Sequence, residues 1–332
     1  MLLSLSKNGI QLTGLGHYLP EQCVSNQELI QIGNLPVDDN WIQKRIGVQQ
    51  RYFAQAEQST SDLALKAALQ AMQAAQASPD EIDLILLSTI SPDHPSPATA
   101  CAIQAALGIK GCPAFDITAA CSGFIYGLDI ASRYVLTGAR KVLLISAEIR
   151  SRFVDLTDPS MAPIFGDAAA AVILEPGPVG QGLLAVDAMA DGSGYYSVYL
   201  PAGGARRPAS HETVDAGEHF LKMPSGEKVF FEVVEGMSQQ AQRFLADLNL
   251  TVSDIDFVIP HQANLMILKE VARRLELPFE KMLINLPQVG NTSSASIPLA
   301  WSQLREDIPT GSKVLLMAAG AGHTAGMALV KT

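Results

Sequence analysis

Runs of consecutive apolar residues, bounded by turn-forming residues, recur along the chain and predict buried strands. They occupy residues 82–88, 113–117, 141–147, 168–174 and 257–260. None of these runs alternates strictly between apolar and polar residues, as a strand with one face in water would. Strands of this kind lie in sheets that are covered on both faces, so the pattern predicts an α/β protein.

Apolar residues at helical spacing fill the segments between these strands. A capped helix is predicted from residues 59–61 to about 77, and a buried helix over 124–134. A third helix is predicted after the loop 91–97, running through Leu107, because Pro97 suits a first helical position.

The second half of the chain repeats the first. Residues 78–86 recur loosely as 251–259, and 141–144 recur as 313–316, with offsets of 173 and 172. These two pairs of matching segments lie far apart in the sequence and have nearly the same offset. They predict a duplicated α/β unit whose halves, 1–175 and 176–332, pack as pseudo-equivalents. The segment 192–227 has weak periodicity, and two alternatives stay open for it: a lid or tunnel wall, or a surface excursion.

Composition narrows the class of protein. The net charge is −10, which argues against general nucleic-acid binding, and an acidic partner would need a local basic patch. The four cysteines show neither paired spacing nor a histidine cluster, so no metal site or disulfide is predicted. The start of the chain lacks a secretory pattern and no apolar run reaches membrane-spanning length, so we expect a cytoplasmic protein.

Cys121 lies among small residues where the strand 113–117 ends and the helix 124–134 begins. Backbone N–H groups and the helix dipole at such a position stabilise a thiolate, so the thiol pKa is expected to lie below its free value. Cys121 is therefore a candidate nucleophile. The alternative is a cysteine that only packs in the core.

Two further residues are candidates for the same site. His261 follows the strand 257–260, and Asn291 is expected to end a strand that begins near Met282. The repeat offset places the counterpart of Cys121 near Ser293, so a pseudo-twofold axis would bring the two junctions face to face at strand ends. A thiolate nucleophile needs a nearby imidazole, and an oxyanion or enolate needs neutral N–H donors.

Glycines near the end of the chain, in residues 320–326, superficially resemble a dinucleotide-binding turn. That turn needs a following helix and an acidic residue about 20 positions later, and the sequence ends at Thr332. We therefore predict a bent backbone that approaches the catalytic pocket closely.

Four motifs in one order carry a family resemblance that covers essentially the whole chain. They lie at residues 119–123, 260–264, 290–296 and 320–326. The sequence resembles β-ketoacyl-acyl-carrier-protein synthase III, a thiolase-fold family. The resemblance implies a duplicated five-layered αβαβα fold, a homodimer and decarboxylative Claisen condensation in fatty-acid biosynthesis, with no cofactor beyond the substrates acyl-CoA and malonyl-acyl-carrier protein.

The same resemblance assigns roles to individual residues. Cys121 would accept the acyl group of the primer, and His261 and Asn291 would stabilise the enolate formed from the malonyl group. Other residues would bind the substrate or coenzyme A, namely Trp41, Arg45, Asn264, Phe230, Gly322, His323 and Ser96. For Trp41 and Arg45 the alternative is an amphipathic turn on the surface. Lys269, Arg273 and Arg274 would form the basic patch for the acyl carrier protein; the alternative is a solvated helix face.

Departures from the family pattern bear on the substrate. Pro159 replaces a coenzyme A arginine, and Met266 replaces a carrier-docking arginine. His323 and Ala325 stand where the family has an aromatic residue and a tryptophan; His323 either fills the aromatic space or polarises a carbonyl. Ser96 replaces a bulky phenylalanine that reaches the partner subunit's acyl pocket, which predicts a medium-length primer.

Residues 91–94 look like quinolone- and resorcinol-forming relatives. Two alternative functions therefore remain at this stage: transfer of the acyl group to another acceptor, as in secondary metabolism, and a non-catalytic paralogue that binds acyl thioesters.

Overall fold

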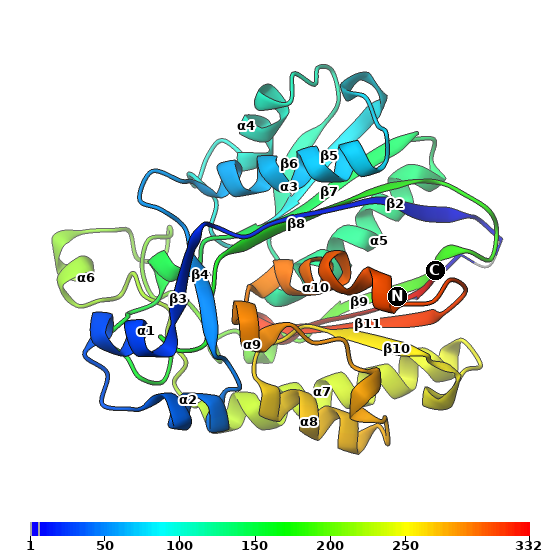
Figure 1. The fold of residues 1–332 in the computed structure, drawn as a ribbon. Coiled ribbons are helices and arrows are strands. Elements are labelled where there is room, and N and C mark those ends of the chain that lie inside the picture. Colours follow the sequence, from blue (N-terminus) through cyan, green and yellow to red (C-terminus); the bar gives the residue numbers. More distant parts are fainter. Residues whose placement is uncertain (1, 6) are drawn as a thin grey trace.

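The computed structural model describes residues 2–5 and 7–332, which form five layers in the order helix, sheet, helix, sheet, helix (Figure 1). The first sheet has the strand order β2-β8-β7-β5-β6. Its strands are β2 (Ile10–Tyr18), β5 (Ile82–Ser88), β6 (Ala114–Ile117), β7 (Lys141–Glu148) and β8 (Ala168–Pro176). β5 runs parallel to β6 and β7, whereas β8 runs antiparallel to β7 and β2.

The second sheet repeats this plan with the order β10-β11-β12-β9. Its strands are β9 (Gly182–Ala190), β10 (Phe257–Pro260), β11 (Lys313–Gly320) and β12 (Thr324–Lys331), and β1 (Leu3–Ser4) pairs with β9. β10 and β11 are parallel, as β5 and β7 are. One residue pair, Ile10 with Gly182, joins the two sheets.

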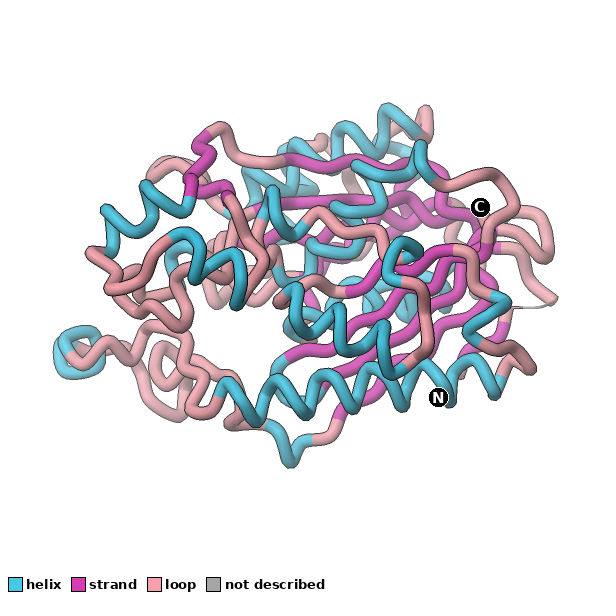
Figure 2. The backbone as a smooth tube through the Cα atoms, turned by 60° about the horizontal axis from the view of Figure 1, so that its bottom comes forward, coloured by secondary structure: helices cyan, strands magenta, loops and turns pink. Residues whose placement is uncertain are grey.

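Helices cover both faces of each sheet. α3 (Thr60–Ala74) and α4 (Thr99–Ala106) form one outer layer, and α7 (Gly226–Asp247) and α8 (Leu265–Arg274) form the other. The middle layer is α5 (Gly123–Leu136) and α10 (Ser296–Leu304). In Figure 2 the molecule is turned so that the layer of α7 and α8 comes forward over the strands of the second sheet.

This layering explains the uninterrupted apolar runs. In β5, Leu84 and Leu86 belong to the core between the two sheets, whereas Ile85 and Leu87 face α3 and α4. Because successive side chains of a strand point to opposite faces, most positions of a doubly covered strand are apolar. The prediction of an α/β protein with covered sheets, and the five-layered fold that the resemblance implied, are confirmed.

The remaining elements gather at one end of the layers (Figure 1). They are β3 (Gln22–Ser25), β4 (Gln50–Phe53), α1 (Asn26–Gly33), α2 (Asp39–Arg45), α6 (His211–Asp215) and α9 (Leu286–Val289). None of the helices in the described part of the chain combines the length and hydropathy needed to cross a lipid bilayer.

The two sequence repeats correspond to matching structures. A 3₁₀ turn precedes β5 and another precedes β10, and each is closed by a capping box, Ser78 with Glu81 and Thr251 with Asp254. The boundary between residues 175 and 176 stays a prediction, and β1 pairs with the second sheet although it begins the first half.

Two boundary predictions are wrong. The expected strand from Met282 to Asn291 is absent; the segment contains α9, and only single-residue bridges flank it, Val258 with Met282 and Phe165 with Asn291. Pro287 has no N–H to donate to a strand ladder. The buried Gln262 side chain instead accepts the N–H groups of Asn285 and Leu286, at 2.9 and 2.8 Å.

α4 begins at Thr99 rather than at Pro97. The carboxylate of Asp116, on the neighbouring strand β6, accepts the N–H groups of Thr99 and Ala100 at 2.7 and 2.8 Å. These charged hydrogen bonds satisfy the orphan donors of the first turn and fix where the helix starts.

The layered core predicts a large difference between two leucine truncations. Leu316 is fully buried between the sheets, so Leu316→Ala should lower the free energy of unfolding by about 2–5 kcal/mol. Leu69, on α3, is 52% exposed, so Leu69→Ala should change it by less than about 0.5 kcal/mol. Urea denaturation of both variants measures this, and equal effects would contradict the layer assignment.

Candidate active site

Cys121 lies in the 3₁₀ turn η2 (Ala120–Ser122), which links β6 to α5. In the second half, η7 (Ser293–Ala295) leads into α10 in the same way. Ala120 and Ser293, the first residues of the two turns, both have left-handed backbones, with φ of 48° and 53°. The turns pack against each other, and Sγ of Cys121 lies 3.6 Å from Oγ of Ser293. The prediction that the two junctions of the repeat meet is confirmed.

His261 follows β10 directly and is 3% exposed. Its backbone N–H donates to the Met317 carbonyl at 2.6 Å, and its Nδ1 lies 2.8 Å from Oγ of Ser296, the first residue of α10. These contacts fix the ring and occupy Nδ1. The Ser296 contact leaves Nε2 as the ring nitrogen that can act on a ligand.

Asn291 is also nearly buried, and its side-chain amide has a defined orientation. Its Oδ1 accepts the backbone N–H of Ser293 at 2.8 Å, and its own backbone N–H donates to the Ile164 carbonyl at 2.8 Å. Because Oδ1 is occupied, the Nδ2 amino group is left to donate to a ligand.

Cys121, His261 and Asn291 line one cavity of about 200 Å³. Much of its remaining wall is apolar and includes Phe165, Val198, Leu221, Met223 and Phe230. Several wall residues belong to the segment 192–227, so its role as a tunnel wall is favoured over a surface excursion. The described part of the chain has no cluster of three His, Cys, Asp or Glu side chains able to hold a metal ion.

Burial raises the pKa of the Cys121 thiol from 9.0 to about 11, while the Ser293 hydrogen bond and the Arg150 charge act in the opposite direction. This change corresponds to roughly 3 kcal/mol, whereas a helix N-terminus contributes about 0.3–1 kcal/mol. The expectation of a lowered thiol pKa is therefore wrong for the free protein. Loss of water around the sulfur outweighs the helix dipole.

Burial lowers the pKa of His261 from 6.5 to about 4, and a hydrogen bond with the backbone of Ser293 opposes this only partly. The imidazole is therefore neutral at neutral pH. A neutral ring can donate a hydrogen bond from Nε2 when the Ser296 hydroxyl donates to Nδ1.

The glycine turn near the end of the chain passes directly beside Cys121. A Cβ atom added to Gly320 would lie 2.8 Å from the backbone nitrogen of Cys121 and 3.1 Å from that of Ser122. Gly322 has a φ of 75° within η9 (Ala321–His323). The prediction of a bent backbone close to the pocket is confirmed.

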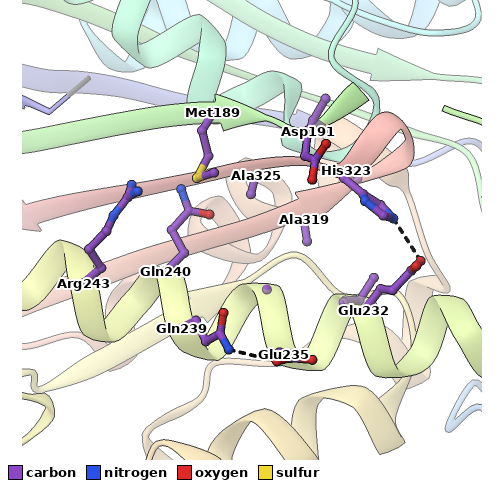
Figure 3. A pocket seen from close by; sticks show the side chains of 14 residues that line it. Met189, Asp191, Glu232, Glu235, Gln239, Gln240, Arg243, Ala319, His323 and Ala325 are labelled. Atoms are coloured by element: carbon purple, nitrogen blue, oxygen red, sulfur yellow. Dashed lines mark hydrogen bonds and ion pairs between the residues drawn. The ribbon is translucent and has the colours of Figure 1, made fainter. Parts of the chain in front are cut away.

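His323 lies on the wall between the catalytic cavity and a second one of about 430 Å³, which it lines together with Glu232 (Figure 3). Nε2 of His323 lies 2.9 Å from Oε2 of Glu232 and 3.4 Å from Oγ of Ser197. Because Nε2 is engaged by Glu232, this arrangement favours the space-filling alternative for His323. The small side chain of Ala325 lines the second cavity.

The other predicted substrate residues divide into two groups. Phe230 and Asn264 line the catalytic cavity, and Nδ2 of Asn264 donates to the backbone carbonyl of Arg45 at 3.0 Å. Trp41, Arg45, Ser96 and Gly322 do not line it, and Trp41, Arg45 and Ser96 are exposed.

The predicted carrier-docking residues lie on α8 and are exposed. Glu270 forms ion pairs with Arg273 at 2.7 Å and Arg274 at 3.3 Å, so it offsets part of their charge. The basic patch is therefore weaker than its three cations alone imply.

The sequence analysis missed Glu148 and Arg150, which follow one another closely at the end of β7. Both are buried, and Arg150 lines the catalytic cavity. Two charged residues directly after a buried strand were the available signal, because ligands bind at the carboxyl ends of strands in α/β sheets.

The low pKa of His261 predicts a specific pH dependence of stability. Between pH 6.5 and about 4 the unfolded chain binds a proton at this position and the folded chain does not. The free energy of unfolding should therefore fall as pH drops through this window, by roughly 3 kcal/mol in total. Urea denaturation across this pH range should show the fall in the free energy of unfolding in wild type and not in His261→Gln. Parallel curves of this free energy against pH for the two proteins would contradict the prediction.

Gly320→Ala should reduce acyl transfer to Cys121, because the new Cβ would displace the backbone of η2. A misplacement on this scale costs on the order of 100-fold in rate. Gly320 has a φ of −149°, which any residue adopts, so the effect would come from contact alone. Gly204→Ala is the control, since an added Cβ there would meet nothing within 4 Å. Mass spectrometry of the acyl-enzyme measures both, and equal rates would overturn the assigned contact.

Family models and curated relatives match this chain. Residues 115–192 match the family model for 3-oxoacyl-[acyl-carrier-protein] synthase III, and residues 245–332 match the model for its C-terminal part. The chain is 43% identical to β-ketoacyl-[acyl-carrier-protein] synthase III of Clostridioides difficile strain 630, over 96% of this chain and 97% of that protein.

Solved structures give the same result. The 3-oxoacyl-[acyl-carrier-protein] synthase III of Aquifex aeolicus VF5 is 36% identical with a TM-score of 0.89, over 98% of this chain and 100% of that one. The priming β-ketosynthase of the R1128 polyketide pathway is 31% identical with a TM-score of 0.88, over 98% and 97% of the two chains. The chain therefore belongs to the β-ketoacyl-acyl-carrier-protein synthase III family.

Proposed function

We propose that this chain catalyses the condensation of an acyl thioester primer with malonyl-acyl-carrier protein, giving a 3-oxoacyl-acyl-carrier protein for fatty-acid biosynthesis. The observation that carries the proposal is the convergence of a thiol, a neutral imidazole and an oriented amide on one cavity. Family membership supports the same reaction.

In the first step, Sγ of Cys121 attacks the carbonyl carbon of the primer thioester. A carbon–sulfur bond to Cys121 forms, the original thioester bond breaks, and the leaving thiolate takes up the proton that the Cys121 thiol gives up. The N-terminus of α5 and the Cys121 backbone N–H favour the negative charge that develops on the sulfur and on the thioester oxygen. The apolar wall limits hydrolysis of the acyl-enzyme by excluding water.

In the second step, the bond between the malonyl Cα and its carboxylate breaks and carbon dioxide leaves. The electron pair forms an enolate, whose oxygen would accept hydrogen bonds from Nε2 of His261 and Nδ2 of Asn291. The enolate carbon then attacks the acyl carbon on Cys121, and the thiolate of Cys121 is released. The thiolate regains its proton from solvent, which completes the cycle without a cofactor.

His261 suits this role because it stays neutral. A protonated ring would bind the malonyl carboxylate and oppose its loss, whereas a neutral Nε2–H donor stabilises the oxygen only as charge develops on it. The proposal requires the tautomer in which the Ser296 hydroxyl donates to Nδ1.

The proposal also includes the binding of coenzyme A, the carrier protein and a second subunit. Trp41 and Arg45 would hold coenzyme A at the entrance, and Lys269, Arg273 and Arg274 would contact the acidic carrier protein. A cytoplasmic homodimer would bring the loop around Ser96 of the partner subunit towards the acyl cavity.

Two substitutions separate the proposed steps. Cys121→Ala should abolish the acyl adduct, whereas Asn291→Ala should leave acylation largely intact and slow condensation by about 100- to 1,000-fold. The measurements are intact-protein mass spectrometry for the adduct and carbon dioxide release for condensation. Cys101→Ala, which removes an exposed cysteine, should affect neither.

Equal loss of acylation in Cys121→Ala and Asn291→Ala would contradict this division of roles. An adduct that persists when malonyl-carrier protein is added would instead indicate transfer to another acceptor.

A further inference from the structure

Arg150 is a buried cation in the wall of the catalytic cavity. It lies just after β7, is 1% exposed and lines the same cavity as Cys121. Its charge is close enough to act on the Cys121 thiol. None of the steps proposed above uses it.

Two nitrogens of the guanidinium group have no hydrogen-bond acceptor among the described residues. Its Nε and Nη1 atoms are buried without a partner, and within residues 2–5 and 7–332 no carboxylate forms an ion pair with it. The nearby carboxylate of Glu148 binds other groups. It accepts hydrogen bonds from Oγ of Ser91 at 2.9 Å and from Oγ of Ser294 at 2.7 Å. Glu148 therefore does not hydrogen-bond to Arg150.

Aromatic rings hold the guanidinium in place. It lies 5.3 Å from the centre of the Phe165 ring and 6.0 Å from that of Phe153, and Phe165 lines the cavity too. Such rings attract a cation. This attraction is weaker than the cost of burying a charge that has no hydrogen-bonded partner. The arginine is thus positioned but not satisfied in the free protein.

A ligand that fits this site must supply oxygen acceptors. Guanidinium has five N–H donors and no acceptor, and its planar fork matches a carboxylate with two parallel hydrogen bonds. The substrates of the proposed reaction offer two places for such a group: the malonyl carboxylate and the far end of the primer.

The primer is favoured over the malonyl group. The malonyl carboxylate must leave as neutral carbon dioxide, and a guanidinium bound to it would stabilise the charge that has to be lost. A carboxylate at the far end of the primer takes no part in the bond changes. The apolar side chains of Val198, Leu221 and Met223 offer a surface for the methylene groups between the two ends.

We propose that the primer of this enzyme is a dicarboxylic acyl thioester and that Arg150 determines this specificity by binding its terminal carboxylate. The proposal rests on the condensing function given above and refines the expectation of a medium-length primer. The bond changes at Cys121 stay the same, and the product is a 3-oxoacyl thioester that carries a carboxylate at its other end.

The test uses primers in matched pairs: succinyl-CoA with butyryl-CoA, and glutaryl-CoA with pentanoyl-CoA. Within at least one pair, wild type should form the Cys121 adduct about 10- to 100-fold faster with the carboxylated primer, as expected for hydrogen bonds to a charged group. Arg150→Leu should reverse this preference, and Arg150→Lys should restore part of it. The control Arg140→Leu changes an arginine whose side chain is 62% exposed and should change neither rate.

Other outcomes separate the alternatives. If Arg150 acts only on the thiol, Arg150→Leu will slow both members of each pair equally and move the pH profile of acylation to higher pH, which would overturn the proposal. If its role is structural, Arg150→Leu will lower the urea midpoint strongly, whereas we expect removal of an unpaired buried charge to leave it unchanged or raise it.

Carbon dioxide release on addition of malonyl-carrier protein tests the condensing function separately. Condensation with only the alkyl primers would overturn the dicarboxylic specificity and keep the function. An adduct that forms selectively with the carboxylated primers, without condensation, would overturn the condensing function and keep the dicarboxylic specificity.

Discussion

The site depends on the contact between two helix-initiating turns, η2 and η7, which come from opposite halves of a duplicated chain. Neither half contains the whole set: η2 carries Cys121, and η7 lies beside Asn291 and leads to Ser296, which holds His261. The 3.6 Å contact between Cys121 and Ser293 is where the halves meet. The site therefore forms only when both sheets pack correctly against α5 and α10.

Burial at this meeting point favours the neutral form of three side chains that can lose or lack a charge. It raises the pKa of the Cys121 thiol and of the Glu148 carboxyl, and it lowers the pKa of the His261 imidazole. An arginine side chain carries its charge at neutral pH. The same desolvation that prepares a neutral donor at His261 therefore leaves Arg150 as a charge that a substrate can neutralise.

Much of the fold was predictable because doubly covered strands leave uninterrupted apolar runs, and because the repeat preserved its spacing. The catalytic candidates Cys121, His261 and Asn291 followed from motifs and from their expected positions near strand ends. The segment 282–291 was not predictable as a helical turn, since the buried Gln262 side chain that satisfies its backbone lies about 20 residues away in sequence. Arg150 was missed although it closely follows a buried strand, because only the packed structure shows that its Nε and Nη1 have no acceptor among the described residues.

The segment that replaces the fifth strand of the second sheet also makes the molecule asymmetric. It covers the free edge of β10 with an irregular chain, through the bridge between Val258 and Met282, whereas β6 ends the first sheet without a further strand in the described residues. A protein with two open sheet edges can add copies without limit and form fibres, because each addition exposes a new edge. Because a single bridged residue pair follows β10 on that side, this edge offers no regular strand ladder that a second copy could extend.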